Sequence, residues 1–100
     1  MQVNIGTLNK RIQIYNADDE LIIEPWAAVN QISGTEMLKN NIQFEQTNVR
    51  FLIRYTRTPI KSDYYIKFNG SSYDIQYTND YNFEHKFIEI IAIKRAYDEG

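Results

Sequence analysis

The stretch DYYIKFNGSSYDIQYT, residues 63–78, constrains the fold of this 100-residue chain more than any other. Apolar and aromatic residues alternate with polar ones on both sides of Asn69-Gly70, which is the side-chain period of a β-strand. Asn-Gly accepts the positive φ angles that a type I′ turn demands. The stretch therefore predicts a tight β-hairpin.

The same alternation predicts further strands before and after this hairpin. They cover residues 8–15, 21–32, 49–56 and 85–97. Pro25 has no backbone N–H for a sheet ladder, so the second strand is expected to be two segments. The last strand has isoleucines on both faces, which is typical of a central or barrel-closing strand. Short strands at this spacing predict a small antiparallel barrel or sandwich, in a single domain spanning residues 1–100.

One stretch, SGTEMLKNNIQFEQ at residues 33–46, does not alternate. Ser33 followed by Glu36 has the form of a capping box, which starts a helix. Leu38 and Ile42 lie four residues apart and give a thin apolar stripe, but the Asn residues around them have weak helix propensity. The stretch predicts a marginal helix or long loop, inserted between two strands at about 33–48.

Composition and motifs argue against several functions. The formal charge of -2 provides no basic field for nucleic-acid binding. No signal peptide or membrane-spanning stretch is recognisable, so we expect a soluble protein inside a cell. There is no cysteine, no phosphate-binding glycine loop and no nucleophile motif. His85 is the only histidine, and NADDE at 16–20 reads as a solvated turn. We therefore predict no enzymatic activity, no catalytic residue, no cofactor and no metal.

The tyrosines support two opposed interpretations. Together with nearby arginines they could form a stacking platform for single-stranded nucleic acid on a small barrel. Tyrosine and arginine are also enriched at protein interfaces, which favours a protein contact surface in an acidic chain. The residues concerned are Tyr64, Tyr65, Tyr73, Tyr77, Tyr81, Arg50, Arg54 and Arg57.

Several motifs, taken in order, resemble the head-tail joining, or head closure, proteins of tailed bacteriophages. They are GTLNKRI near the start, WAAVNQISGTE at 26–36, VRFLIRY ending at Tyr55, FNGSSYDI at 68–75 and FIEIIAIK near the end. The resemblance covers nearly the whole chain and implies an all-β fold: a small antiparallel β-barrel with one short helix or long loop inserted between strands.

The resemblance also implies a function in virion assembly. Such proteins dock as a ring beneath the portal and its adaptor after DNA packaging, close the DNA channel as a stopper, and provide the surface for tail attachment. The implied partners are portal or adaptor connector proteins, tail-terminator or other tail proteins, and further copies of the chain, as a dodecamer on the connector and a monomer in isolation. Packaged DNA would be contacted only incidentally, and no membrane is involved. The implied location is the head-tail interface of the virion, and the host cytoplasm during assembly.

Individual residues receive expected roles from the matching motifs and from the apolar pattern. The expected partner contacts are Arg11, Glu36, Met37, Leu38, Asn40, Ile42 and Arg54. The expected core residues are Ile12, Trp26, Ile53 and Ile75. The alternatives are a single-stranded nucleic-acid-binding barrel or a neighbouring connector or tail-terminator protein. The salt dependence of binding distinguishes a nucleic-acid-binding barrel from ring docking, because only nucleic-acid binding weakens steeply with salt.

Overall fold

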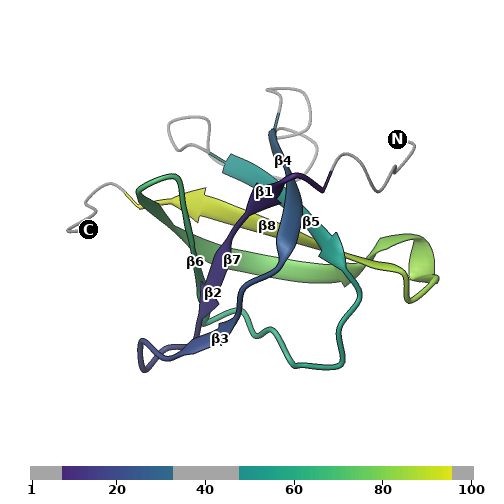
Figure 1. Cartoon of the computed structure of the whole chain (residues 1–100), viewed down its shortest axis with the longest axis horizontal. Helices are drawn as coiled ribbons and strands as arrows, with labels where there is room; N and C mark the ends of the chain where they lie inside the picture. The colour runs from purple at the N-terminus through teal and green to yellow at the C-terminus, as the bar shows by residue number, and fades with distance from the viewer. Residues whose placement is uncertain (1–7, 33–47, 96–100) are drawn as a thin grey trace.

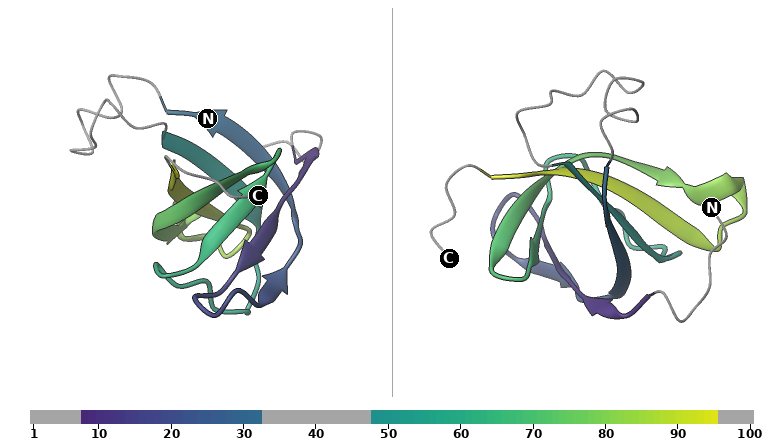
Figure 2. Two further views of the ribbon diagram at one scale, coloured as in Figure 1. Left: turned by 90° about the vertical axis from the view of Figure 1, so that its left-hand side faces the viewer. Right: turned by 90° about the horizontal axis from the view of Figure 1, so that it is seen from above.

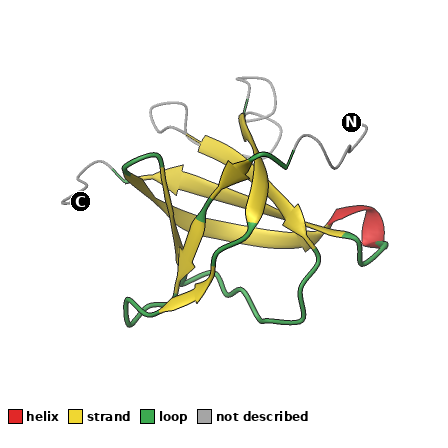
Figure 3. Cartoon of the chain, in the orientation of Figure 1, coloured by secondary structure: helices red, strands yellow, loops and turns green. Residues whose placement is uncertain are grey.

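The computed structural model describes residues 8–32 and 48–95, which form eight β-strands and one 3-10 helix (Figures 1 and 3). No helix within these two ranges has the length and apolarity needed to span a membrane. The elements are β1 (Lys10–Arg11), β2 (Gln13–Tyr15), β3 (Leu21–Ile23), β4 (Trp26–Gln31), β5 (Asn48–Arg54), β6 (Tyr65–Phe68), β7 (Ser71–Asp80), η2 (Tyr81–Phe83) and β8 (Phe87–Lys94).

All neighbouring strands are antiparallel, in the order β1-β4-β5-β8-β7-β6-β2-β3. β1 and β2 are consecutive parts of one segment, although one pairs with β4 and the other with β6. The sheet therefore curls back on itself, as Figure 2 shows. The predicted all-β, antiparallel, barrel-like fold is confirmed, and β8 lies centrally between β5 and β7 as its apolar faces predicted.

In the first hairpin, β1 and β2 face β4 and β3, and the pairing is interrupted at Ile12 and at Pro25. Pro25 separates β3 from β4, as predicted, because it cannot donate to a ladder. Its carbonyl oxygen accepts a hydrogen bond of 3.1 Å from the backbone N–H of Ile12, the residue between β1 and β2. The two strands of this hairpin therefore stay joined where their regular pairing stops.

The predicted Asn-Gly turn joins β6 to β7. Phe68 pairs with Ser71, and the two residues between them have positive φ angles, 54° at Asn69 and 82° at Gly70. These are the backbone angles for which Asn and Gly are selected in a two-residue hairpin turn.

The inner face of the sheet holds the main core, in which Phe51 is fully buried. Its ring makes edge contacts with Phe68 and Tyr73, at centroid distances of 6.0 and 5.4 Å. The buried residues of this cluster are Ile12, Ile14, Ala27, Val49, Phe51, Ile53, Ile66, Tyr73, Ile75, Ile88, Ile90 and Ala92.

Trp26 does not belong to this core, and its expected core role is wrong. Its side chain is 53% exposed. Successive residues of a strand point to opposite faces, and Ala27 is the residue of this pair that enters the core. Trp26 therefore points outward.

A second apolar cluster lies on the outer face of the sheet. It consists of Leu8, Ala28 and Leu52, with Tyr81 and Phe87 packed against it. Since Leu52 is buried outside and its neighbour Ile53 inside, β5 is covered on both faces.

The insertion between β4 and β5 leaves and re-enters the barrel at one point. The backbone N–H of Ile32 donates a 3.0 Å hydrogen bond to the carbonyl oxygen of Asn48, and both residues are buried. Apart from Asn48, the helix or loop expected at 33–48 lies outside the described residues. So do five expected contacts: Glu36, Met37, Leu38, Asn40 and Ile42.

Candidate functional site

Two of the expected partner contacts, Arg11 and Arg54, lie on either side of Trp26. Arg11 on β1 is directly opposite Trp26 on β4. On the other side the β4–β5 ladder ends with Ala27 opposite Ile53, and the adjacent residues Trp26 and Arg54 line one hollow. The pairing of three strands thus builds a row of Arg, Trp and Arg on the outer face of the barrel.

The side chains of this row form an aromatic anchor with a basic rim. The guanidinium carbon of Arg11 lies 5.1 Å from the centre of the indole ring, which is cation–π range. Arg11 also pairs with Glu24 at 3.7 Å, and both of these side chains are exposed. A hollow lined by Leu8, Asn9, Trp26 and Arg54 adjoins the ring. We call Leu8, Asn9, Arg11, Trp26 and Arg54 the Trp26 surface.

The Trp26 surface has the composition of a protein-binding site. Trp and Arg are the residue types most often found at the energetic centre of interfaces, where an aromatic ring fills a pocket and the rim is polar. Within residues 8–32 and 48–95, no group of three or more His, Asp or Glu side chains is placed to hold a metal ion.

Sequence reasoning found the two arginines of this surface and misassigned its centre. The tryptophan was expected inside because large apolar residues usually are. Alternation does not correct this, because Trp26 shares its strand face both with Asn30, which is exposed, and with Ala28, which is buried.

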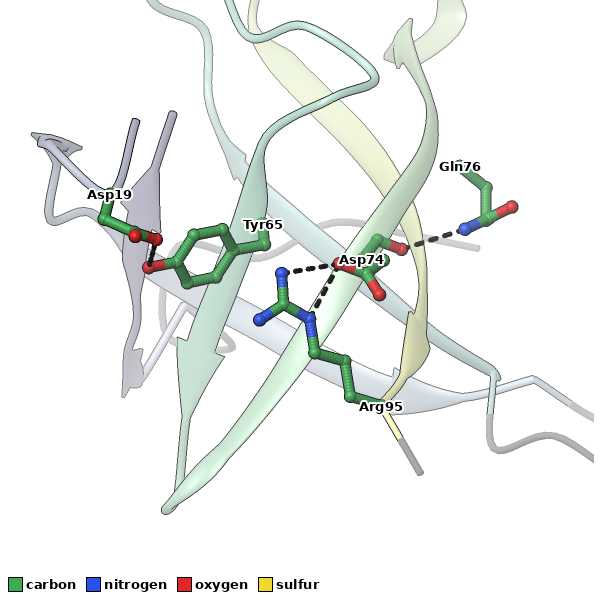
Figure 4. Close-up of polar contacts among 5 residues, drawn as sticks. All are labelled: Asp19, Tyr65, Asp74, Gln76 and Arg95. Carbon is green, nitrogen blue, oxygen red and sulfur yellow. Dashed lines mark hydrogen bonds and ion pairs between the residues drawn. The ribbon is translucent and has the colours of Figure 1, made fainter. Parts of the chain in front are cut away.

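A second polar cluster connects four elements of the barrel (Figure 4). The hydroxyl of Tyr65 donates a 2.8 Å hydrogen bond to Asp19, in the turn after β2. Arg95 lies over the Tyr65 ring at 4.4 Å and reaches Asp74 through two nitrogens, at 2.8 and 2.9 Å. The ring of Tyr15 stacks on Tyr65, with centroids 5.2 Å apart. Sequence analysis did not detect this cluster.

The environment of Tyr65 changes its acidity. Burial of the phenol, followed by its hydrogen bond to Asp19 and the charge of that carboxylate, raises the pKa of Tyr65 to about 12. A neutral phenol that donates to a carboxylate joins the β2–β3 turn to β6. We assign this cluster a structural role, because its groups satisfy one another.

Three of the five tyrosines considered for a nucleic-acid stacking platform are not available to it. Tyr73 lies in the main core, Tyr65 is buried in the stack just described, and Tyr81 packs on the outer apolar cluster. Arg50 forms a 2.7 Å ion pair with Glu89. Stacking requires exposed rings along one groove, and these rings are distributed over both faces of the sheet.

Comparison with known proteins identifies relatives of this fold. The family model described as phage head completion protein matches residues 3–95. Among curated proteins, no match is found. A protein from Shigella flexneri 2a, known from its solution structure, is 24% identical and superimposes with a TM-score of 0.71, covering 94% of this chain and 98% of that one. At 24% sequence identity, the structural similarity between the two proteins shows a common fold.

Proposed function

This chain belongs to the phage head completion protein family, and we propose that it docks as a ring beneath the portal and its adaptor after DNA packaging. Family membership makes it a structural, non-enzymatic component of the virion at the head, which interacts with other phage head or tail proteins. In our proposal the docked ring closes the DNA channel and offers the tail its attachment surface. The chain is monomeric in the host cytoplasm and assembles, as a dodecamer, only on the connector.

The observation that carries the docking proposal is the exposure of Trp26 between two arginines. A half-exposed tryptophan is available to a partner, and tryptophan is enriched among the residues that contribute most to interface free energy. An acidic or carbonyl-rich surface of a connector protein would complement Arg11 and Arg54. We therefore assign the Trp26 surface to the portal or adaptor, and tail proteins to the remaining exposed side of the ring.

Channel closure is assigned to the insertion between β4 and β5. The hydrogen bond between Ile32 and Asn48 fixes both ends of this segment on the rigid barrel. Many copies of one segment, carried by a ring, can meet on its axis and act together through multivalency. Glu36, Met37, Leu38, Asn40 and Ile42 are the residues that we propose for these contacts, with DNA contacted only incidentally.

The test uses DNA-filled heads that lack this protein. Adding the purified chain should retain the DNA and permit tail attachment, whereas heads without it should release DNA. A deletion of Thr35 to Gln46 leaves Ser33, Gly34 and Thr47 between Ile32 and Asn48, a length that can close a hairpin. We expect this variant to dock and accept tails but to release DNA.

Three results would contradict the proposal in different ways. Retention of DNA by the deletion variant, at the level of the full chain, would remove the insertion from the closure mechanism. Failure of the full chain to bind the heads would refute docking. If the chain binds oligonucleotides, and its binding weakens steeply as the salt concentration rises, it would instead be a nucleic-acid-binding protein.

A further inference from the structure

The connection between β7 and β8 holds a phenylalanine in solvent. Phe83, the last residue of η2, is 85% exposed, more than any other large apolar side chain among the described residues. Trp26, Tyr55 and Tyr77 are exposed by only 41–53%. Aromatic residues are enriched at protein interfaces, so a ring this exposed is a candidate contact.

The loop around Phe83 is held in place by its own contacts. A side-chain oxygen of Asp80 accepts a 2.9 Å hydrogen bond from the backbone N–H of His85, and the same carboxylate contacts the His85 ring. Tyr55 packs against that ring at 5.0 Å, and its backbone N–H donates to the carbonyl oxygen of Lys86 at 2.9 Å. These contacts fix the protruding loop to the end of β5.

The backbone of the loop is also strained. Phe83 and His85 have φ angles of 56° and 58°, in the left-handed region that residues with a Cβ seldom occupy. Such strain persists only where surrounding contacts impose it, and it often marks a functional segment. The loop therefore presents Phe83 in a fixed position, which lowers the entropic cost of inserting it into a partner.

A hollow of about 310 Å³ lies at the other end of β7. It lies where the chain leaves its pairing with β4 after Arg11 and begins to pair with β6 at Gln13. Arg11, Gln13 and Glu24 line one side, and Lys67, Phe68 and Ser71 line the other. We call this space the flank hollow. Phe68 gives it an apolar side chain, Arg11 and Lys67 are cationic, and Glu24 is paired with Arg11.

Phe83 and the flank hollow lie on opposite sides of the barrel. β7 runs from Ser71, which lines the hollow, to Asp80, which holds the loop. Ten residues of strand span about 30 Å, since each adds about 3.3 Å. Figure 1 shows the β6–β7 turn at the left and η2 at the far right, and the right-hand view of Figure 2 agrees. The Trp26 surface adjoins both features. Arg11 also lines the flank hollow, and Arg54 precedes Tyr55, which contacts the Phe83 loop.

We propose that Phe83 of one copy inserts into the flank hollow of the next copy and so forms the contact between neighbouring subunits of the ring. A protrusion on one side and a hollow on the other make a head-to-tail contact, the type that generates closed rings when the rotation between copies fits. This inference rests on the proposed function, because it specifies the neighbour within the docked ring.

Charge complements this fit. The side chain of Glu84, the residue after Phe83, is 54% exposed, and it forms a 3.6 Å pair with Lys86, which is 70% exposed. Such a surface pair contributes little, so Glu84 can exchange it for Lys67 at the rim of the neighbour's hollow. Glu84 and Lys67 thus place opposite charges beside the aromatic ring and beside its pocket, while Glu24 in the hollow is already paired with Arg11.

The test uses site-directed cross-linking, which the absence of cysteine from this chain makes selective. A double variant, Phe83→Cys with Ser71→Cys, is added to DNA-filled heads and oxidised mildly. We expect a ladder of covalent oligomers on denaturing gels. The matched control, Leu21→Cys with Ser71→Cys, replaces an apolar residue that is 51% exposed on β3 and should give no ladder.

Each outcome is decisive. Binding to heads without a ladder above the control would overturn the subunit contact and leave the docking proposal intact. No binding by the unmodified chain would overturn both. As a second measurement, Phe83→Ala should lower the number of copies bound per head at least tenfold at limiting protein concentration, while Leu21→Ala should not.

Discussion

Replacing Trp26 by alanine should weaken docking to the connector by about two orders of magnitude. An aromatic side chain of this size has up to about 250 Å² of surface, so at 53% exposure about 130 Å² remains to be buried on docking. At about 25 cal/mol for each Å², that burial contributes about 3 kcal/mol. This corresponds to a Kd about 100-fold higher in the Trp26→Ala variant.

The assay is equilibrium binding of fluorescently labelled protein to DNA-filled heads, measured by sedimentation. Leu21→Ala is the matched control, because Leu21 is 51% exposed and lies on β3, away from the Trp26 surface. Circular dichroism melts of both variants establish that they are folded at the assay temperature. A Trp26→Ala affinity within about threefold of the unmodified chain, or an equal loss in Leu21→Ala, would refute the reasoning.

Three further predictions concern the barrel itself. In Tyr65→Phe, urea unfolding should show a loss of about 1 kcal/mol near neutral pH, where the neutral phenol donates to Asp19. Because the pKa of Tyr65 is raised from 10.0 to about 12, its stabilising effect is complete below pH 10 and disappears as pH rises through 12; a difference between variant and unmodified chain that does not shrink over this range would contradict the assignment. Gly70→Ala should cost about 1–2 kcal/mol in the same assay, because φ is 82° and no atom lies within 4 Å of the added Cβ, so only backbone strain is introduced; an unchanged unfolding midpoint would be inconsistent with that conformation. Phe51→Ala should cost about 3–5 kcal/mol, because the ring is fully buried and makes two edge contacts, and a loss below about 1 kcal/mol would place this ring outside the core.

The features that the sequence predicts correctly are those with a local chemical cause. The β6–β7 turn follows from Asn69-Gly70, because positive φ is required and these two residues tolerate it. The break between β3 and β4 follows from the missing N–H of Pro25. The central position of β8 follows from isoleucines on both faces, since such a strand needs cover on both sides.

The features that the sequence does not reveal depend on pairing between distant segments. Tyr65 and Asp19 are 46 residues apart, and no local pattern relates a tyrosine to a turn in another hairpin. The face that Trp26 occupies is decided by which neighbour enters the core, and Ala27 and Ala28 give little hydrophobic contrast to show it. Arg11 and Arg54 were expected as contacts individually, but their meeting across Trp26 follows only from the register of β1, β4 and β5.

The closed base of the β4–β5 insertion, where Ile32 bonds to Asn48, separates the evolution of the insertion from that of the barrel. Once the two ends of a loop are held together, each doubling of its length costs only about 0.6 kcal/mol of closure free energy. Substitutions, deletions and additions in this segment can therefore accumulate without loss of the fold. The same property makes this position a suitable place to graft a foreign peptide, such as an epitope or an affinity tag, onto the isolated barrel.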